Sequence, residues 1–198
     1  MNKGKFVVFE GMECTGKTSV IGRLRRLRPD WVYVSELPET TVMKSLLCEK
    51  EYDLTPEAEL LLFTARRAEQ IKKIILPAIE NGKTVIGDRF IFSTLVYQGL
   101  CGNFQLSDIL LLHHIYCGNI MSDINILLDA PVDVSIQRLL ARGYSDRIES
   151  RGMEFFTKVR NGFLEFYANN IIIDTSVYDI DTVTEMVLNL IEGEQENV

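Results

Sequence analysis

Short apolar runs alternate along the chain with longer segments in which apolar residues recur every three or four positions. The runs are rich in β-branched and aromatic residues and predict strands at Lys5 to Glu10, Trp31 to Val34, Thr84 to Gly87, Ile124 to Leu128 and Ile171 to Asp174. The segments between them predict helices, and strands that alternate with helices are typical of a parallel sheet. Several runs are apolar throughout, as expected of central strands that helices cover on both faces. We therefore expect an α/β fold, a three-layer sandwich around a five-stranded parallel sheet.

One long helix carries its own boundary signals. Thr55 suits the N-cap, and Pro56 suits the first helical position, where the missing N–H has no helical partner to lose. The pair Asn81-Gly82 is expected to end this helix. Pro77 lies inside it, so we expect one lost hydrogen bond and a bend in the last turn.

Length and composition restrict the possible classes of protein. The chain has 198 residues, 46% hydrophobic content and no repeat or low-complexity linker, so we expect one domain over residues 1–198. Its formal net charge of −7 argues against a general nucleic-acid binder. No apolar run reaches the roughly 18 residues of a membrane span, and no leader-like segment is present. We expect a cytoplasmic protein that binds neither nucleic acid nor membranes.

Cysteine and histidine give no metal or disulfide signal. The four cysteines form no C-x-x-C pair, and the only histidines are the neighbours His113 and His114, to which we give no role. Neither a zinc site nor a disulfide framework is indicated, and reduced thiols are expected.

The clearest chemical signal follows the first predicted strand. Residues Gly11 to Thr18 read Gly-Met-Glu-Cys-Thr-Gly-Lys-Thr and match the phosphate-binding pattern G-x-x-x-x-G-K-[ST] between a strand and a helix. Backbone N–H groups of such a loop surround phosphates, the Lys17 ammonium follows the β- and γ-phosphates, and the Thr18 hydroxyl can ligate Mg²⁺. The alternative is an ordinary glycine-rich turn with an exposed lysine. We expect a nucleoside triphosphate to contact Gly11, Met12, Glu13, Cys14, Thr15, Gly16, Lys17, Thr18 and Ser19.

Other motifs distinguish between the classes of protein that use such a loop. The chain has no N-K-x-D, which a guanine-specific switch would need. The third predicted strand ends in Asp88-Arg89 rather than in the carboxylate pair usual for ATPase motors. A lone acid followed by arginine fits transfer to a bound anionic acceptor better than it fits hydrolysis.

Four segments, in order, resemble thymidylate kinases. The segment from Asp88 to Gly99 resembles the family's D-R-[YF]-x-x-S-x-x-A-Y-Q-G, and Leu61 to Arg67 resembles its L-L-F-x-A-x-R helix. Phe9-Glu10-Gly11 with the loop resembles the family's opening, and Ala141 to Glu149 is similar to its bacterial-type lid. The resemblance covers about residues 6–174. It implies a P-loop NTPase fold of the nucleoside monophosphate kinase type, with a lid at about residues 142–150.

The same resemblance implies an activity. A member of this family transfers the γ-phosphoryl group of ATP to dTMP with Mg²⁺, giving dTDP and ADP for dTTP synthesis, and is a homodimer. Two alternatives stay open: a broader or differently selective deoxynucleoside monophosphate kinase, and a non-catalytic nucleotide-binding regulatory protein.

The resemblance also implies an acceptor pocket. Phe63 would stack on the thymine ring and Arg67 would hydrogen-bond its edge, whereas the neighbouring Arg66 points about 100° away on the helix and is expected to be solvated. Without the resemblance, Phe63 would be taken as core. The remaining pocket residues implied are Glu13 near the sugar 3′-hydroxyl, Arg89 on the acceptor phosphate, Tyr97 where a ribose 2′-hydroxyl would lie, and Ser93 and Gln98 as further contacts. For Tyr97, Ser93 and Gln98 a purely structural role is the alternative.

The implied catalytic groups are those that neutralise charge. Asp88 would lie near the metal with Thr18, and Lys17, Arg89 and the lid arginines Arg142 and Arg147 would meet the transferred phosphoryl group, with Arg138 as a further candidate. Because a phosphomonoester has its second pKa near 6, no general base is required. The alternative for the lid arginines is a solvated helix face.

One segment departs from the family pattern. Where many relatives have R-E-P-G-G, this chain reads Ser35-Glu36-Leu37-Pro38-Glu39, with no arginine. A second clamp on the acceptor phosphate is therefore missing from this segment, and a lost charged hydrogen bond typically costs about 1.5 to 3 kcal/mol. The choice of acceptor base is accordingly left open.

Overall fold

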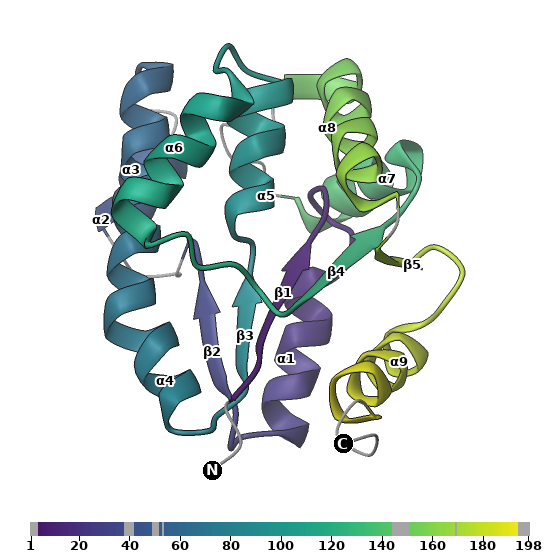
Figure 1. Cartoon of the computed structure of the whole chain (residues 1–198). Coiled ribbons are helices and arrows are strands. Elements are labelled where there is room, and N and C mark those ends of the chain that lie inside the picture. The colour runs from purple at the N-terminus through teal and green to yellow at the C-terminus, as the bar shows by residue number, and fades with distance from the viewer. Residues whose placement is uncertain are drawn as a thin grey trace.

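The computed structural model describes residues 4–37, 42–48, 52, 54–143, 151–168 and 170–193. Within these residues one parallel sheet has the order β2-β3-β1-β4-β5 (Figure 1). Its strands are β1 (Phe6–Glu10), β2 (Val32–Ser35), β3 (Val85–Asp88), β4 (Ile124–Asp129) and β5 (Ile171–Asp174). Each lies within one residue of its predicted bounds at either end, so the predicted five-stranded parallel sheet is confirmed.

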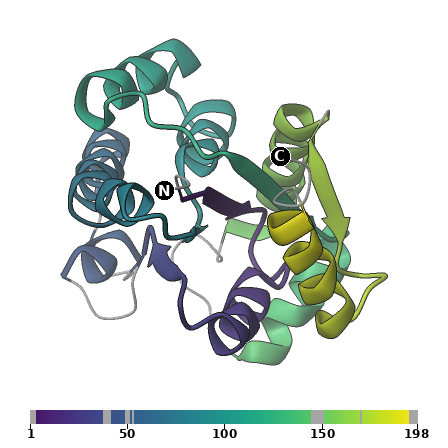
Figure 2. The ribbon, with the colours of Figure 1, turned by 60° about the horizontal axis from the view of Figure 1, so that its bottom comes forward.

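Helices cover both faces of this sheet (Figures 1 and 2). On one face lie α1 (Lys17–Leu27) and α9 (Ile180–Glu192). On the other lie α3 (Pro56–Gln70), α4 (Leu76–Glu80), α5 (Ile91–Thr94) and α6 (Leu106–Cys117). The remaining helices are α2 (Val42–Cys48), α7 (Val132–Arg142) and α8 (Gly152–Tyr167), and π-helical turns form η1 (Ile71–Ile75) and η2 (Leu95–Leu100). The predicted three-layer sandwich is confirmed.

The central strand β1 shows why its sequence is apolar throughout. Val7 and Phe9 face the core under α1 and α9, whereas Phe6 and Val8 face the core under α3, α4 and α6. Successive side chains of a strand point to opposite faces, so a strand buried on both sides needs apolar residues at every position. The same register places the carboxyl ends of β1 and β3 side by side, with Phe9 opposite Asp88.

The long helix begins and ends where the sequence predicts. The Thr55 side chain accepts a hydrogen bond from the backbone N–H of Ala58, and α4 ends just before Asn81 and Gly82. The distortion caused by Pro77 lies elsewhere than expected: η1 widens the turn before it, and Pro77 itself occupies the first turn of α4. A wider turn moves carbonyl groups away from the proline ring, which would clash with them in a regular helix.

Candidate active site

The loop after β1 has a backbone that glycine permits. Gly11 has a φ of 137° and Gly16 a φ of 93°, and a Cβ on Gly11 would lie 2.2 Å from the Leu128 carbonyl oxygen. Cys14 also has a positive φ, 57°, which costs a non-glycine residue about 1 to 2 kcal/mol. Such alternating conformations aim successive N–H groups inward, so the loop forms an anion-binding concavity at the start of α1.

Lys17 is folded into this concavity. Its Nζ donates hydrogen bonds to the carbonyl oxygens of Gly11, at 2.8 Å, and Met12, at 2.6 Å. Burial, followed by the nearby Arg89 charge, lowers the pKa of Lys17 to about 8. The neighbouring Thr18 and Ser19 are exposed at the first turn of α1, where a phosphate or metal can reach them.

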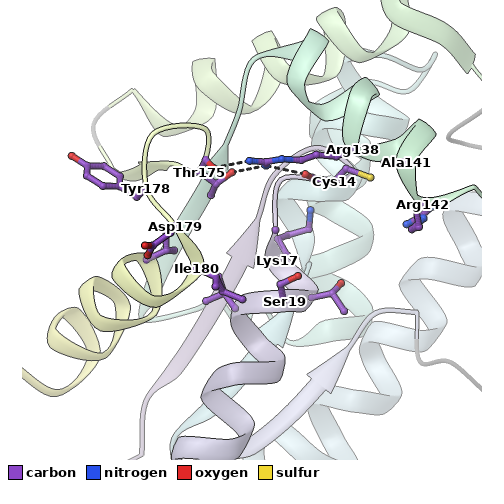
Figure 3. A pocket seen from close by; sticks show the side chains of 14 residues that line it. Cys14, Lys17, Ser19, Arg138, Ala141, Arg142, Thr175, Tyr178, Asp179 and Ile180 are labelled. Atoms are coloured by element: carbon purple, nitrogen blue, oxygen red, sulfur yellow. Dashed lines mark hydrogen bonds between the residues drawn. The ribbon is translucent and has the colours of Figure 1, made fainter.

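Two cavities in the described part of the chain meet at the loop. The larger, about 770 Å³, lies between α1, α7 and the segment after β5 (Figure 3). The smaller, about 190 Å³, lies between the loop, α3 and the segment after β3. Both are lined by Cys14, Lys17, Thr18 and Arg142. A ligand in each cavity would therefore present its phosphates to the same lysine.

The larger cavity includes residues that the sequence did not point to. Thr175, Tyr178 and Ile180 follow β5 and line the wall opposite α7 (Figure 3). Arg138 of α7 donates hydrogen bonds to the Thr175 carbonyl oxygen, at 2.7 Å, and to the Cys14 carbonyl oxygen, at 3.3 Å. Arg138 thus joins α7 to the loop and to the end of β5. No motif marks these wall residues, because only the sheet order brings β5 close to the loop.

In the smaller cavity Arg89 is held at an unusual backbone angle. Its φ is 67°, in the left-handed region, and its guanidinium donates to Glu13 Oε1 at 3.0 Å and to Ser93 Oγ at 3.1 Å. The Tyr97 hydroxyl lies 2.6 Å from both carboxylate oxygens of Glu13 and donates to that carboxylate. Burial and the Glu13 carboxylate raise the pKa of Tyr97. The four side chains form one connected polar wall.

Arg67 is fully buried beside this wall. It donates to Glu36 through Nε, at 3.0 Å, and through a second nitrogen that also donates to Thr94 Oγ1. Its guanidinium carbon lies 5.4 Å from the centre of the Phe90 ring. Burial raises the pKa of Glu36 against the opposing effect of Arg67. Neither Glu36 nor Thr94 is among the pocket residues predicted from the sequence, although both line this cavity.

Other predicted pocket residues line the smaller cavity, which Arg67 does not. Phe63 lines the cavity and packs on Leu47 of α2, and Gln98 lines it while donating to Glu59 Oε1 at 2.7 Å. Asp88 lies on the same wall, next to Arg89. The prediction that Arg66 is solvated is wrong for one of its atoms. Its Nε is buried and has no hydrogen-bond partner in the described structure.

The lid is described only at its beginning. Arg142 ends α7 between the two cavities, and Gly143 follows with a φ of 74° that ends the helix. The rest of the predicted lid, 144–150, including Arg147, lies outside the described residues.

Thr18 and Asp88 fit an Mg²⁺ ion that arrives with phosphates. The Thr18 hydroxyl and the Asp88 carboxylate both line the smaller cavity, and both are hard oxygen ligands. No group of three or more histidine, cysteine, aspartate or glutamate residues suited to a metal occurs among the described residues. Mg²⁺ typically uses one or two protein oxygens together with phosphates and water, so two such residues match the usual number of protein ligands.

A phosphate-binding loop with a cavity on either side of its lysine defines a P-loop phosphotransferase of the nucleoside monophosphate kinase type. The family model described as Thymidylate kinase matches residues 9–187. The chain belongs to the thymidylate kinase family, whose members use ATP with Mg²⁺.

Individual relatives agree with this family. The chain is 33% identical over 167 residues to a thymidylate kinase from Kosmotoga olearia, covering 81% of this chain and 80% of the relative. It is 38% identical over 179 residues to one from Prochlorococcus marinus, covering 81% and 82%. The solved thymidylate kinase of Candida albicans has the same fold, with a TM-score of 0.79 at 23% identity over 98% of this chain and 93% of the other. No helix in the described ranges has the length and apolar character needed to cross a membrane.

Proposed function

We propose that this chain transfers the γ-phosphoryl group of ATP to dTMP, giving dTDP and ADP. The observation that carries the proposal is the smaller cavity, where Phe63, Arg89 and Glu13 gather beside the lysine of the loop. An aromatic face suits a base and a guanidinium suits a phosphate. Lys17 lines this cavity and the larger one, so a donor in the larger cavity would present its phosphates to the same lysine.

The acceptor would lie with its base against Phe63. Thr94 lines the cavity and would meet the polar edge of the base, whereas Arg67 lies behind it, donates a hydrogen bond to Thr94 and does not itself line the cavity. Tyr97 and Glu13 would contact the sugar, and a ribose 2′-hydroxyl would have to displace the Tyr97 ring. Ser93 and Gln98 complete the pocket.

The donor would lie in the larger cavity. Its phosphates would follow the loop from Gly11 to Ser19, and its base would lie near Tyr178 and Ile180. Arg138 is already bound to the loop and to Thr175, so it would shape this cavity as well as add positive charge.

Transfer needs alignment and charge neutralisation. An oxygen of the acceptor phosphate attacks the γ-phosphorus, the bond from that phosphorus to the β–γ bridging oxygen breaks, and ADP leaves with the electron pair. Lys17, Arg89, Arg142 and Arg147 would stabilise the charge on the transferred group. Thr18 and Asp88 would hold Mg²⁺, which would supply further neutralisation of the donor phosphates.

A broader deoxynucleoside monophosphate kinase is the second candidate. The observation that favours it is Ser35 at the end of β2, where relatives with R-E-P-G-G have an arginine. The neighbouring Glu36 carboxylate accepts a hydrogen bond from Arg67. A thymine methyl group in an apolar slot contributes only about 1 kcal/mol, so selection against dUMP should be about fivefold to tenfold.

The test is ADP release from ATP and Mg²⁺ with single acceptors. We expect fast turnover with dTMP, slower turnover with dUMP, and negligible turnover with dGMP, dAMP, dCMP, UMP or thymidine. A different best acceptor would support the second candidate. ATP binding without turnover on any monophosphate would support a regulatory nucleotide-binding protein instead.

We further propose that two copies of the chain associate. On α6, Leu110, Leu111, Ile115 and Tyr116 are each about half exposed, and Leu61 of the adjacent α3 is 54% exposed. Contiguous exposed apolar side chains mark interaction surfaces, and a second copy would cover them.

A further inference from the structure

Glu10 is a buried carboxylate for which the proposed transfer has no use. It ends β1, immediately before the phosphate-binding loop, and has no solvent exposure. A buried carboxylate is costly unless hydrogen bonds satisfy its oxygens, so its partners indicate why the position is not apolar.

The side-chain hydrogen bonds of Glu10 in the described structure go to the segment after β3. Its Oε1 accepts from the backbone N–H groups of Phe90, at 2.8 Å, and Ser93, at 3.2 Å. Its Oε2 accepts from the Ser93 hydroxyl. Because α5 begins at Ile91, Glu10 satisfies N–H groups at the start of that helix from another strand, as an N-cap side chain would.

This binding fixes both flanks of Arg89. Upstream, the Arg89 N–H donates to the Phe9 carbonyl oxygen at 2.9 Å, and downstream Phe90 is held by Glu10. A left-handed backbone at a non-glycine residue persists only where the surroundings over-determine it. Glu10 and its strand supply that constraint.

The Ser93 hydroxyl connects Glu10 to the Arg89 side chain. Since its hydrogen is donated to Glu10, its lone pairs face outward and accept from Arg89 at 3.1 Å. A glutamine at position 10 could still accept from the two N–H groups, but its amide would donate to Ser93 and leave the serine hydrogen without this acceptor.

We propose that Glu10 is a positioning residue that acts through Ser93 to hold Arg89 in the conformation that receives the acceptor phosphate. The proposal rests on the proposed function in one respect, since it takes the smaller cavity as the acceptor site. Glu10 does not line that cavity.

The test compares Glu10→Gln, Ser93→Ala and the double variant by steady-state kinetics and by equilibrium titration at pH 8, above the pKa of about 7 to which burial raises Glu10. We expect Glu10→Gln to raise the KM for the acceptor at least fivefold while the KM for ATP changes less than twofold. The acceptor KM of the double variant should be no more than twofold above that of Ser93→Ala, because both changes break the same chain of hydrogen bonds from Glu10 through Ser93 to Arg89.

Asp129→Asn is the matched control. Asp129 ends β4 as Glu10 ends β1, but it pairs with Arg160 of α8, at 2.7 Å, and does not line the smaller cavity. We expect it to lower thermal stability without a selective rise in the acceptor KM. A rise below fivefold in Glu10→Gln, an equal rise in the KM for ATP, or effects that multiply in the double variant would overturn the proposal.

The titration separates this proposal from the proposed function. It uses whichever nucleoside monophosphate binds the wild-type protein best, with ADP as the ligand of the other cavity. If the wild type phosphorylates no acceptor, the proposed function fails. A selective fivefold loss of monophosphate affinity in Glu10→Gln would still support the role of Glu10, and unchanged affinity would refute it.

Discussion

Lys17 keeps its ammonium inside the loop, where burial works against its charge and lowers its pKa to about 8. A ligand phosphate would replace the carbonyl oxygens of Gly11 and Met12 as its partners. We predict that Lys17→Met lowers turnover by about 10² to 10³, the range found when a preorganised transition-state donor is lost. Circular dichroism should show an intact fold. Lys73→Met, which removes an exposed lysine paired with Glu69, serves as the control and should keep full activity. Near-normal turnover in Lys17→Met would refute the role of this lysine.

Glu10 should make stability depend on pH. Burial, opposed mainly by the Ser93 hydrogen bond, raises the pKa of Glu10 from 4.5 to about 7 in the folded protein. Between these values the folded chain retains the proton that the unfolded chain has lost, so stability falls as the pH rises. The other ionisable groups that act on Glu10 are Arg89, Glu36, Lys17 and Tyr167.

Glu10→Gln removes this titration. We predict that the free energy of unfolding of the wild type, relative to Glu10→Gln, decreases by about 1 to 3 kcal/mol between pH 4.5 and pH 8. Urea unfolding of both proteins across this range measures the difference, in which groups that titrate alike cancel. Parallel curves would show that Glu10 does not titrate there.

At the scale of elements, two helical glycines have opposite packing. A Cβ on Gly22 of α1 would meet no atom within 4 Å, whereas one on Gly162 of α8 would lie 3.2 Å from Val96 Cγ1 and 3.1 Å from Leu100 Cδ1. Alanine favours a helix interior over glycine by about 0.5 to 1 kcal/mol, so Gly22→Ala should stabilise the protein by that amount.

Gly162→Ala should instead lower the stability of the protein. Val96 is fully buried and β-branched, so it cannot easily move aside, and overpacking typically costs about 1 to 3 kcal/mol. We predict a net loss of about 1 kcal/mol, measured with Gly22→Ala by the same thermal unfolding experiment. Equal stabilisation by both changes would mean that α8 and η2 are less closely packed than the structure indicates.

At the scale of the whole molecule, the exposed face of α6 predicts association. Sedimentation should give about twice the 22.6 kDa of one chain for the wild type, whereas Leu111→Glu with Ile115→Glu should give one chain, because charges would be buried at the interface. Met186→Glu on α9, on the opposite side of the sheet, is the control and should leave the dimer intact. A monomeric wild type would contradict the proposed dimer.

The element pattern was readable in the sequence because it depends on local spacing. Apolar runs and the intervening helical periods identified every strand to within one residue at each end, and Thr55 with Pro56 marked a helix start through backbone chemistry that needs no distant partner. Pro77 was recognised as a disturbance, but how the helix would absorb it depends on packing, and η1 was not foreseen.

By itself the sequence determined the fold class, the phosphate-binding loop and the residue types available to an acceptor, since the order of residues in a strand, loop or helix directly fixes these. Only the tertiary structure decided which distant groups meet. Glu36 lies against Arg67, 31 positions apart, and Glu10 against Ser93, 83 positions apart. Thr175 reaches Arg138 only because β5 lies beside β4. Such pairs have no characteristic spacing in the sequence, because the residues come together only when the whole sheet is buried on folding.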